Sequence, residues 1–296
     1  MGKHRTLVFI NALAILLFVS SGLVHGQNAI TGEWTADAKQ EKAGKIHLSF
    51  NRTSERGGKN QHGSTFDITD LQGLSDSPNG NVSFRLIRDA GTIECVGTFA
   101  NGRGYGTFNF VPNIGFVDAM RNRGFDFTSQ SSKNGHDSTE EKLFAATTLN
   151  VTTALADDLR SANFPNLDTG DLFKAAIFKI DGKFMAEMKA TGFPNLGMED
   201  LVKARIFKID ADFVRRTRDM GFGTDSFENL VKFSIFKVTP EFLVELREAG
   251  LTDLNSEDVV KLRIFKIDAA YVRDARSTEP NITVEQLVQK RIGVLR

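Results

Sequence analysis

The tripeptide Ile-Phe-Lys occurs four times in this chain, as Ile177–Lys179, Ile206–Lys208, Ile235–Lys237 and Ile264–Lys266. Successive copies lie 29 residues apart. Self-similarity at a fixed period of this order is the sequence signature of architectures in which small units stack on one another. The repetition therefore decides how the C-terminal half of the chain is interpreted.

Cutting the chain after each of these lysines gives four equal units and a fifth that is one residue short before Leu287. The five units are 151–179, 180–208, 209–237, 238–266 and 267–296. Residues 113–150 follow the same pattern through Phe116, Gly124-Phe125 and Leu143, with a polar insertion at residues 126–139. We interpret them as a degenerate leading repeat whose polar insertion forms a loop.

Each unit is predicted to form two helices. Residues that favour helix N-caps open both, and a Gly followed by an apolar residue, as in Gly192-Phe193, closes the first. The predicted starts are Thr152, Asp181, Asp210, Thr239 and Asp268 for the first helices, and Asp168, Gly197, Asp225, Asn255 and Thr283 for the second. A lone hairpin of this size cannot bury its apolar face, so the units are expected to stack into an α-solenoid.

Aromatic residues recur at two positions of the unit. One column is Phe178, Phe207, Phe236 and Phe265, and the other is Leu155, Phe184, Phe213, Phe242 and Tyr271. Because stacking must supply the core, we interpret both columns as packing between repeats.

Basic residues recur as well. Two lysine columns fit a solvated face with local pairing, because Glu199–Lys203, Glu228–Lys232 and Glu257–Lys261 are spaced i,i+4 and the lysines of Ile-Phe-Lys follow helix ends. A third column has no such regular acid, and it is the candidate binding site for an acidic partner. Its members are Arg160, Lys189, Arg218, Arg247 and Arg276.

Residues 30–112 alternate apolar and polar side chains between turn signals, which predicts a small antiparallel β domain. The predicted strands are 32–38, 45–52, 64–70, 82–88, 92–99 and 104–111, with turns at 55–63 and 75–81. A meander, a sandwich and a small barrel all fit this pattern. The glycines of Gly102–Gly106 indicate close backbone approach or a bend rather than a phosphate loop. The fold class expected for the whole chain is α+β.

The N-terminus has the features of a secretory signal. Lys3 and Arg5 precede an apolar stretch from Leu7 to Val19, and small residues lead to Gly26. We therefore expect cleavage after residue 26 and export to the periplasm or the extracellular space, with no integral membrane segment left afterwards. Removing residues 1–26 leaves 35 basic and 37 acidic side chains, which gives no excess positive charge for binding nucleic acid.

Residues that carry chemistry are scarce. Two of the five histidines fall in residues 1–26, and no remaining pair has metal-ligand spacing. Cys95, the only cysteine, lies on the same predicted strand face as Ile93 and Phe99, so we expect a buried, inert thiol rather than one that pairs between chains. The sequence also lacks a nucleophile elbow and a phosphate loop. We expect a protein that is not an enzyme and that uses no metal and no cofactor.

One unit reads Val238-Thr-Pro-Glu-Phe-Leu-Val-Glu-Leu-Arg-Glu-Ala-Gly-Leu-Thr-Asp-Leu. It resembles the helical repeats that follow the peptidase module of bacterial antirepressor-type membrane metallopeptidases, which are relatives of β-lactam sensors. The resemblance covers about residues 150–296 only. The chain has no His-Glu-x-x-His motif, so no catalytic residue carries over. The resemblance implies a sensor-like or scaffolding repeat region in a bacterial envelope.

Together these features predict an exported, non-catalytic interaction protein that binds a protein or peptide through the repeat surface. A small-ligand or carbohydrate sensor built on the β domain is the alternative. An unrecognised hydrolase is a further alternative, since two convergent carboxylates would leave no mark in a sequence.

Overall fold

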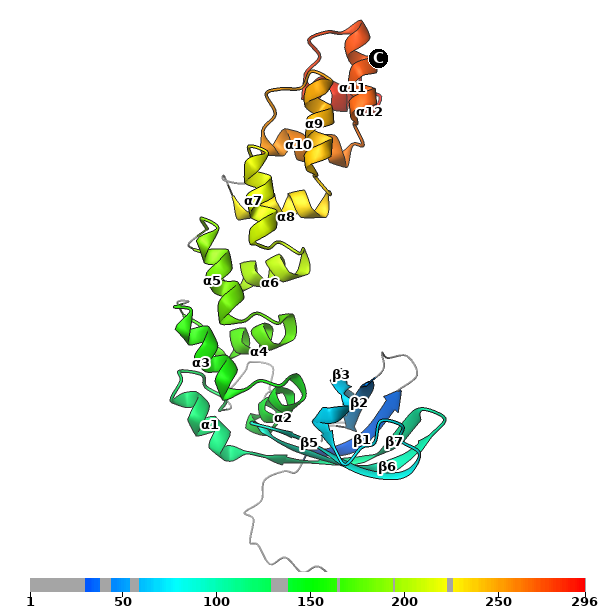
Figure 1. The fold of residues 1–296 in the computed structure, drawn as a ribbon, viewed down its shortest axis with the longest axis vertical. Helices are drawn as coiled ribbons and strands as arrows, with labels where there is room; N and C mark the ends of the chain where they lie inside the picture. The colour runs from blue at the N-terminus through cyan, green and yellow to red at the C-terminus, as the bar shows by residue number, and fades with distance from the viewer. Residues whose placement is uncertain are drawn as a thin grey trace, which may run out of the picture.

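The computed structural model describes residues 30–37, 44–53, 59–128, 138–163, 166–193, 195–222 and 226–295. The predicted signal peptide, residues 1–26, lies outside them. Within this part of the chain a curled antiparallel sheet of seven strands is followed by twelve α-helices (Figure 1). The α+β fold class is confirmed.

The sheet consists of two antiparallel meanders, and the first strand of one pairs with the last strand of the other. Its strands are β1 (Ile30–Asp37), β2 (Lys45–Thr53), β3 (Lys59–Asp67), β4 (Leu71–Gln72), β5 (Gly80–Arg88), β6 (Gly91–Ala100) and β7 (Arg103–Pro112). Their order across the sheet is β3-β2-β1-β7-β6-β5-β4, with every pair antiparallel. The first and last long strands, β1 and β7, are thus neighbours at its centre.

The strand predictions need correction at both ends of β3. Residues 59–63, expected to belong to a turn, are part of β3, where Gly63 pairs with Ser49. The predicted strand 64–70 ends at Asp67 and passes into a short 3-10 helix, Ile68–Asp70, before β4. β3 is the last strand on its side of the sheet, and the polar, glycine-containing composition of such an edge resembles that of a turn.

The sheet core is built around Trp34. Its indole Nε1 donates a hydrogen bond to the Val96 carbonyl at 3.1 Å, and its ring packs beside those of Phe84 and Phe99. Gly97 and Gly106 face each other across β6 and β7, and a Cβ on either would collide with backbone and with the Trp34 ring. The predicted close backbone approach is confirmed at Gly106.

Cys95 is buried in the same core. Burial raises the pKa of its thiol to about 12. The predicted burial of Cys95 is confirmed, and a buried, protonated thiol is a poor nucleophile.

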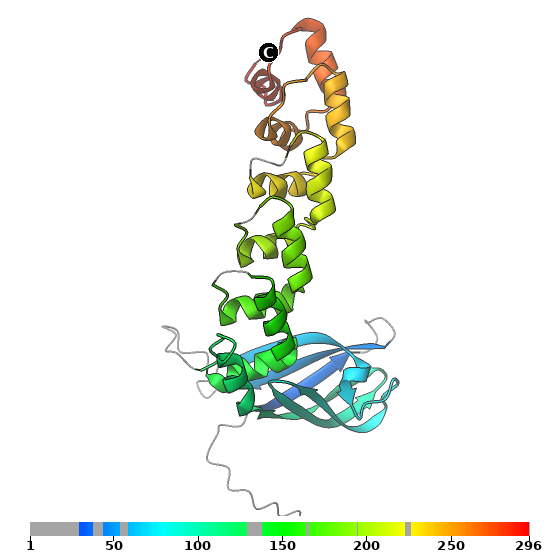
Figure 2. The same ribbon diagram turned by 60° about the vertical axis from the view of Figure 1, so that its left-hand side comes forward.

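The helices form two rows that lead away from the sheet (Figures 1 and 2). The odd row contains α1 (Ile114–Arg121), α3 (Thr153–Ser161), α5 (Gly182–Ala190), α7 (Ala211–Asp219), α9 (Pro240–Glu248) and α11 (Ala269–Thr278). The even row contains α2 (Thr139–Leu149), α4 (Thr169–Phe178), α6 (Met198–Ile206), α8 (Phe227–Ile235), α10 (Ser256–Ile264) and α12 (Val284–Arg291). Members of the even row contact one another in order along the row.

The predicted helix starts are confirmed at nine of ten positions. Side-chain oxygens at all five predicted starts of α3, α5, α7, α9 and α11 accept a hydrogen bond from the backbone amide three residues later. Asp168, Gly197, Asn255 and Thr283 are the N-caps of their helices. Ser226, not Asp225, caps α8, and Asp225 lies outside the described residues.

The first even-row helix is buried against the sheet. The Phe144 ring of α2 contacts the rings of Phe50, Phe108 and Phe110, with centroids between 5.3 and 5.9 Å apart. One buried apolar cluster therefore runs from the sheet through the first helices as far as Val231 in α8. A second cluster extends from Phe222 to Val288.

The predicted polar loop at residues 126–139 contains one exception. Phe127 is fully buried and packs against Phe116 and Phe173. Residues 129–137 lie outside the described part of the chain.

Candidate partner-binding surface

The predicted basic column lies in the last turns of odd-row helices. Four of its members donate a hydrogen bond to a backbone carbonyl 26 to 37 residues earlier in the chain. The acceptors are the carbonyls of Arg123 for Arg160, Thr191 for Arg218, Met220 for Arg247 and Gly250 for Arg276. Lys189 is exposed on α5.

These arginines therefore sit at the C-terminal end of the preceding odd-row helix, where carbonyl groups lack helical partners and the helix dipole is negative. Contact with the neighbouring helix accounts for their periodic placement. Their role in holding a partner stays a prediction.

A second arginine column escaped the sequence analysis. The capping arginines, Arg205, Arg263 and Arg291, donate to the carbonyls of Lys179, Lys237 and Phe265 at the end of the preceding even-row helix. Each guanidinium also lies over an aromatic ring of its own hairpin, at 3.7 Å from the centroid of Phe184, 4.0 Å from Phe242 and 5.0 Å from Tyr271.

A signal for this column was present in the sequence. The repeat with Ser234 in place of Arg still donates a hydroxyl hydrogen bond to the Phe207 carbonyl. In the repeat with Leu155 in place of the aromatic residue, Ala176 occupies the arginine position. Arginine thus occurs only where the partner column is aromatic, as expected for a cation–π pair.

Isoleucines form the most regular exposed apolar feature of the described chain. The isoleucine ladder consists of Ile177, Ile206, Ile235, Ile264 and Ile292, which lie in the last turn of an even-row helix or directly after it. Each is between 47% and 55% exposed. The phenylalanine that follows each of the first four is half-buried against the core, which confirms the packing predicted for that column. Exposed apolar surface can mark an interaction site, so the ladder is a candidate for one.

The lysines of Ile-Phe-Lys adopt an unusual backbone conformation. Lys179, Lys208, Lys237 and Lys266, here called the left-handed lysines, have φ angles of 52–53°. The next residue of each, such as Ile180 or Ile209, is buried and donates its amide to the carbonyl five positions back. This is the Schellman helix ending, whose left-handed position Gly or Asn normally occupies.

Other helix ends in the chain follow the normal preference. The odd row has Gly124, Asn163, Gly192, Gly221 and Gly250 at positive φ, and the ends of the even row have Asn150 and Gly293. The described non-glycine residues at positive φ are either asparagines or these four lysines. A side chain other than Gly in the left-handed region costs about 1 kcal/mol. Lysine at this position therefore carries a conformational cost that the chain avoids elsewhere.

The lysine column inside the even-row helices behaves differently. Lys174 pairs with Glu199 at 2.5 Å, Lys203 with Glu228 at 3.1 Å, and Lys261 with both Glu257 and Glu285. Most of these ion pairs join successive helices of the row. Of the predicted i,i+4 pairs, Glu257–Lys261 is confirmed at 3.5 Å, whereas Glu199 and Glu228 each pair with a lysine of the preceding even-row helix. The left-handed lysines form no ion pair with any described residue.

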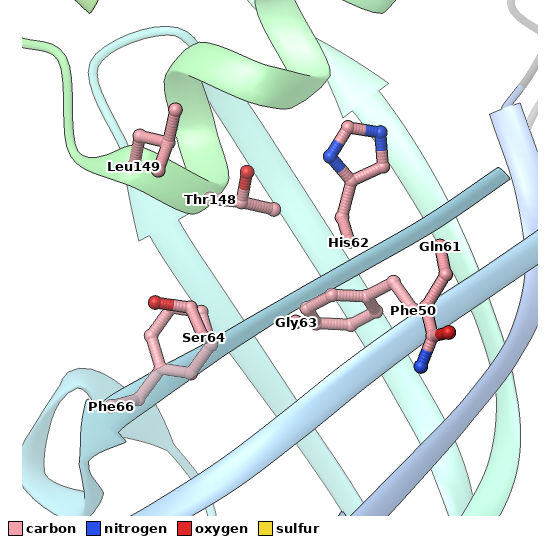
Figure 3. A pocket seen from close by; sticks show the side chains of 8 residues that line it. All are labelled: Phe50, Gln61, His62, Gly63, Ser64, Phe66, Thr148 and Leu149. Atoms are coloured by element: carbon pink, nitrogen blue, oxygen red, sulfur yellow. The ribbon is translucent and has the colours of Figure 1, made fainter. Parts of the chain in front are cut away.

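The β domain has a small pocket between β2, β3 and the end of α2 (Figure 3). Its volume is about 220 Å³, and its walls include Phe50, His62, Ser64 and Thr148. Burial lowers the pKa of His62, the charge of Arg52 lowers it further, and that of Glu141 opposes them. The site thus combines an apolar floor with one titratable group.

Comparison with known proteins adds no relative. No family model matches the chain, and no curated protein matches it. The resemblance to antirepressor-type repeats stays a prediction. Among the described residues, no helix combines the length and apolar character that a bilayer span requires. The same residues hold no group of three or more His, Cys, Asp or Glu side chains arranged to bind a metal ion.

Proposed function

We propose that this chain is an exported, non-catalytic interaction protein whose residues 151–296 form a solenoid of 29-residue repeats. Its function would be to bind a protein partner along the even row, with the β domain as the base from which the rows extend. The antirepressor-like resemblance fits a scaffold or sensor of this kind.

The isoleucine ladder is the observation that carries the proposal. Isoleucine is among the residues most often fully buried in folded proteins, and here one half-exposed isoleucine recurs at the same place in each repeat. Scattered exposed apolar residues need no explanation, but a periodic line of five along one row does. A partner that covers this line would bury apolar surface, which is the main favourable term in protein association.

Two other surfaces support a function less well. The predicted basic column is partly occupied, because four of its five members hold neighbouring carbonyls. The pocket of the β domain, at about 220 Å³, is smaller than the roughly 300 Å³ at which small-molecule sites begin. Binding of a small ligand or carbohydrate in this pocket, with His62 as its polar contact, is the second candidate function.

A pull-down with three baits tests the proposal. Residues 27–296 would be immobilised in their native form, as a variant with Ile206, Ile235 and Ile264 replaced by Ser, and as a variant with the basic column reversed to Glu. The extract would come from the exported fraction of the source organism. We expect the native bait to capture a protein that the Ile→Ser variant loses.

The other outcomes are equally informative. Loss only in the charge-reversed variant would move the binding surface to the basic column. Equal capture by all three baits, with each variant folded by circular dichroism, would contradict binding along either column and direct attention to the β domain.

A further inference from the structure

The first four members of the isoleucine ladder and the left-handed lysines belong to the same tripeptide, so each of these four exposed isoleucines lies two residues from an exposed lysine. We propose that this combined surface binds an extended polypeptide segment that is both acidic and apolar. The inference rests on the proposed function and deepens it, because it names the chemistry of the partner and the residues that recognise it.

The choice of lysine is the first step. The same left-handed position is occupied by Asn150 in the leading repeat and by Gly293 in the last, and by Gly or Asn at the ends of α1, α3, α5, α7 and α9. Only the four inner even-row positions use a residue that the left-handed conformation disfavours. A backbone position at which the less stable residue recurs four times indicates that its side chain is needed for something other than the fold.

The usual structural reason for a lysine at a helix end does not apply here. A cation there can interact with the exposed carbonyls and the negative end of the dipole. In this chain one carbonyl at each of these helix ends already accepts from a neighbouring repeat, through the guanidinium groups of Arg205, Arg263 and Arg291 and the Ser234 hydroxyl. The lysine ammonium groups are therefore left for the solvent or for a partner.

Charge complementarity then defines that partner. The acids nearest in sequence, Asp181, Asp210 and Asp268, direct their carboxylates to helix N-terminal amides and form no ion pair with the lysines in the described part of the chain. Glu199 and Glu228 are paired with the other lysine column. A lysine without an ion-pair partner among the described residues, two positions from an exposed isoleucine and repeated four times, fits carboxylates alternating with apolar side chains.

The geometry of packed helices sets the expected period of such a partner. Neighbouring helices pack about 8–10 Å apart, and an extended chain advances about 3.3 Å per residue. One apolar residue of the partner would therefore meet each step of the ladder about every third position. A carboxylate next to it would face the lysine of the same step.

Synthetic peptides of defined composition test this inference directly. The first is an 18-residue peptide of six Leu-Glu-Ser triplets carrying a fluorescent label. Three matched peptides replace Glu with Lys, replace Leu with Ser, or scramble the order at constant composition. Binding of each to residues 27–296 would be measured by fluorescence anisotropy at low ionic strength. We expect the Leu-Glu-Ser peptide to bind at least about tenfold more tightly than each control.

The protein variants separate the lysines from the fold. One variant replaces Lys179, Lys208, Lys237 and Lys266 with Asn, the residue at the equivalent position 150. The control variant removes four exposed odd-row charges by changing Lys183, Arg215, Arg216 and Arg273 to Asn. The first should bind the acidic peptide about tenfold more weakly at unchanged or raised thermal stability, and the control should bind like the native chain.

Three results would overturn the inference: equal binding of the acidic and basic peptides, unchanged binding after Lys→Asn, or a lower melting temperature of the Lys→Asn variant. The last would assign the lysines to the fold. Failure of this inference is distinguishable from failure of the proposed function, because a natural partner captured through the isoleucines alone would survive Lys→Asn and be lost on Ile→Ser.

Discussion

At the residue scale, the repeats are joined through side chains that reach the end of the preceding helix. Arg263 illustrates the arrangement, since it donates to the Lys237 carbonyl while its guanidinium lies over the Phe242 ring. The sequence predicts the aromatic column as packing but does not reveal its arginine partner, because the two residues lie 21 positions apart and meet only after the hairpin closes.

Replacing Arg263 with Ala should destabilise the chain. The change removes a cation–π contact and a charged hydrogen bond to a carbonyl, and we expect a loss of about 1–2 kcal/mol in the free energy of unfolding. Arg273→Ala, at an exposed position on α11, is the control and should change stability by less than about 0.5 kcal/mol. Urea titration of both variants measures the difference, and equal midpoints would contradict this role for Arg263.

His62 should make stability depend on pH. Burial lowers its pKa in the folded state, so the unfolded chain, with a pKa of about 6.5, binds a proton more readily. Stability is therefore highest above about pH 6.5 and falls as the pH drops through that value towards the lower folded-state pKa. His62→Gln should lose less stability than the native chain between about pH 7.5 and 5.5 in urea unfolding. An identical loss in both chains would show that His62 is not responsible.

At the element scale, helix starts were predictable and the first half of β3 was not. Asp210 and its equivalents are recognisable because N-capping is local, requiring only a short polar side chain three residues before the amide that it accepts from. β3 is an edge strand whose residues 59–63 are set by pairing with β2, a contact that no local pattern contains. Non-local pairing overrode the turn-like composition.

Asp210→Ala should destabilise the chain, because it removes the N-cap of α7. We expect a loss of about 1 kcal/mol in the free energy of unfolding. Asp212→Ala serves as the matched control, because Asp212 lies two residues later and forms an exposed ion pair with Arg215 at 3.0 Å. Such exposed pairs contribute little, so the control should lose clearly less stability in thermal unfolding. A larger loss for Asp212→Ala would assign the effect to charge rather than to capping.

At the scale of the whole molecule, the sequence places a boundary near residue 112, but the buried core crosses it. Composition changes there because strands give way to helices, which is what a sequence can reveal. Burial of Phe144 against three strands depends on how α2 lies on the sheet, and a 3.6-residue period does not specify what covers a helix. The half-buried ion pair between Arg52 and Glu141, at 2.6 Å, holds the same helix.

The two buried clusters predict which parts of the chain unfold together. Phe144→Ala leaves a cavity in the cluster that includes the sheet and the first helices. It should lower the free energy of unfolding by about 3–5 kcal/mol. In this variant the backbone amides of β1, β2 and β7, and those of α3 to α6, should exchange faster, because all these elements share that core. Leu262→Ala, in the second cluster, should cost about 2–5 kcal/mol but raise exchange mainly in α8 to α12. Hydrogen exchange read by mass spectrometry resolves these segments. If Leu262→Ala released the sheet amides too, the rows and the sheet would form one cooperative unit, and a partner bound at any step of the ladder would stabilise the whole molecule rather than its own half.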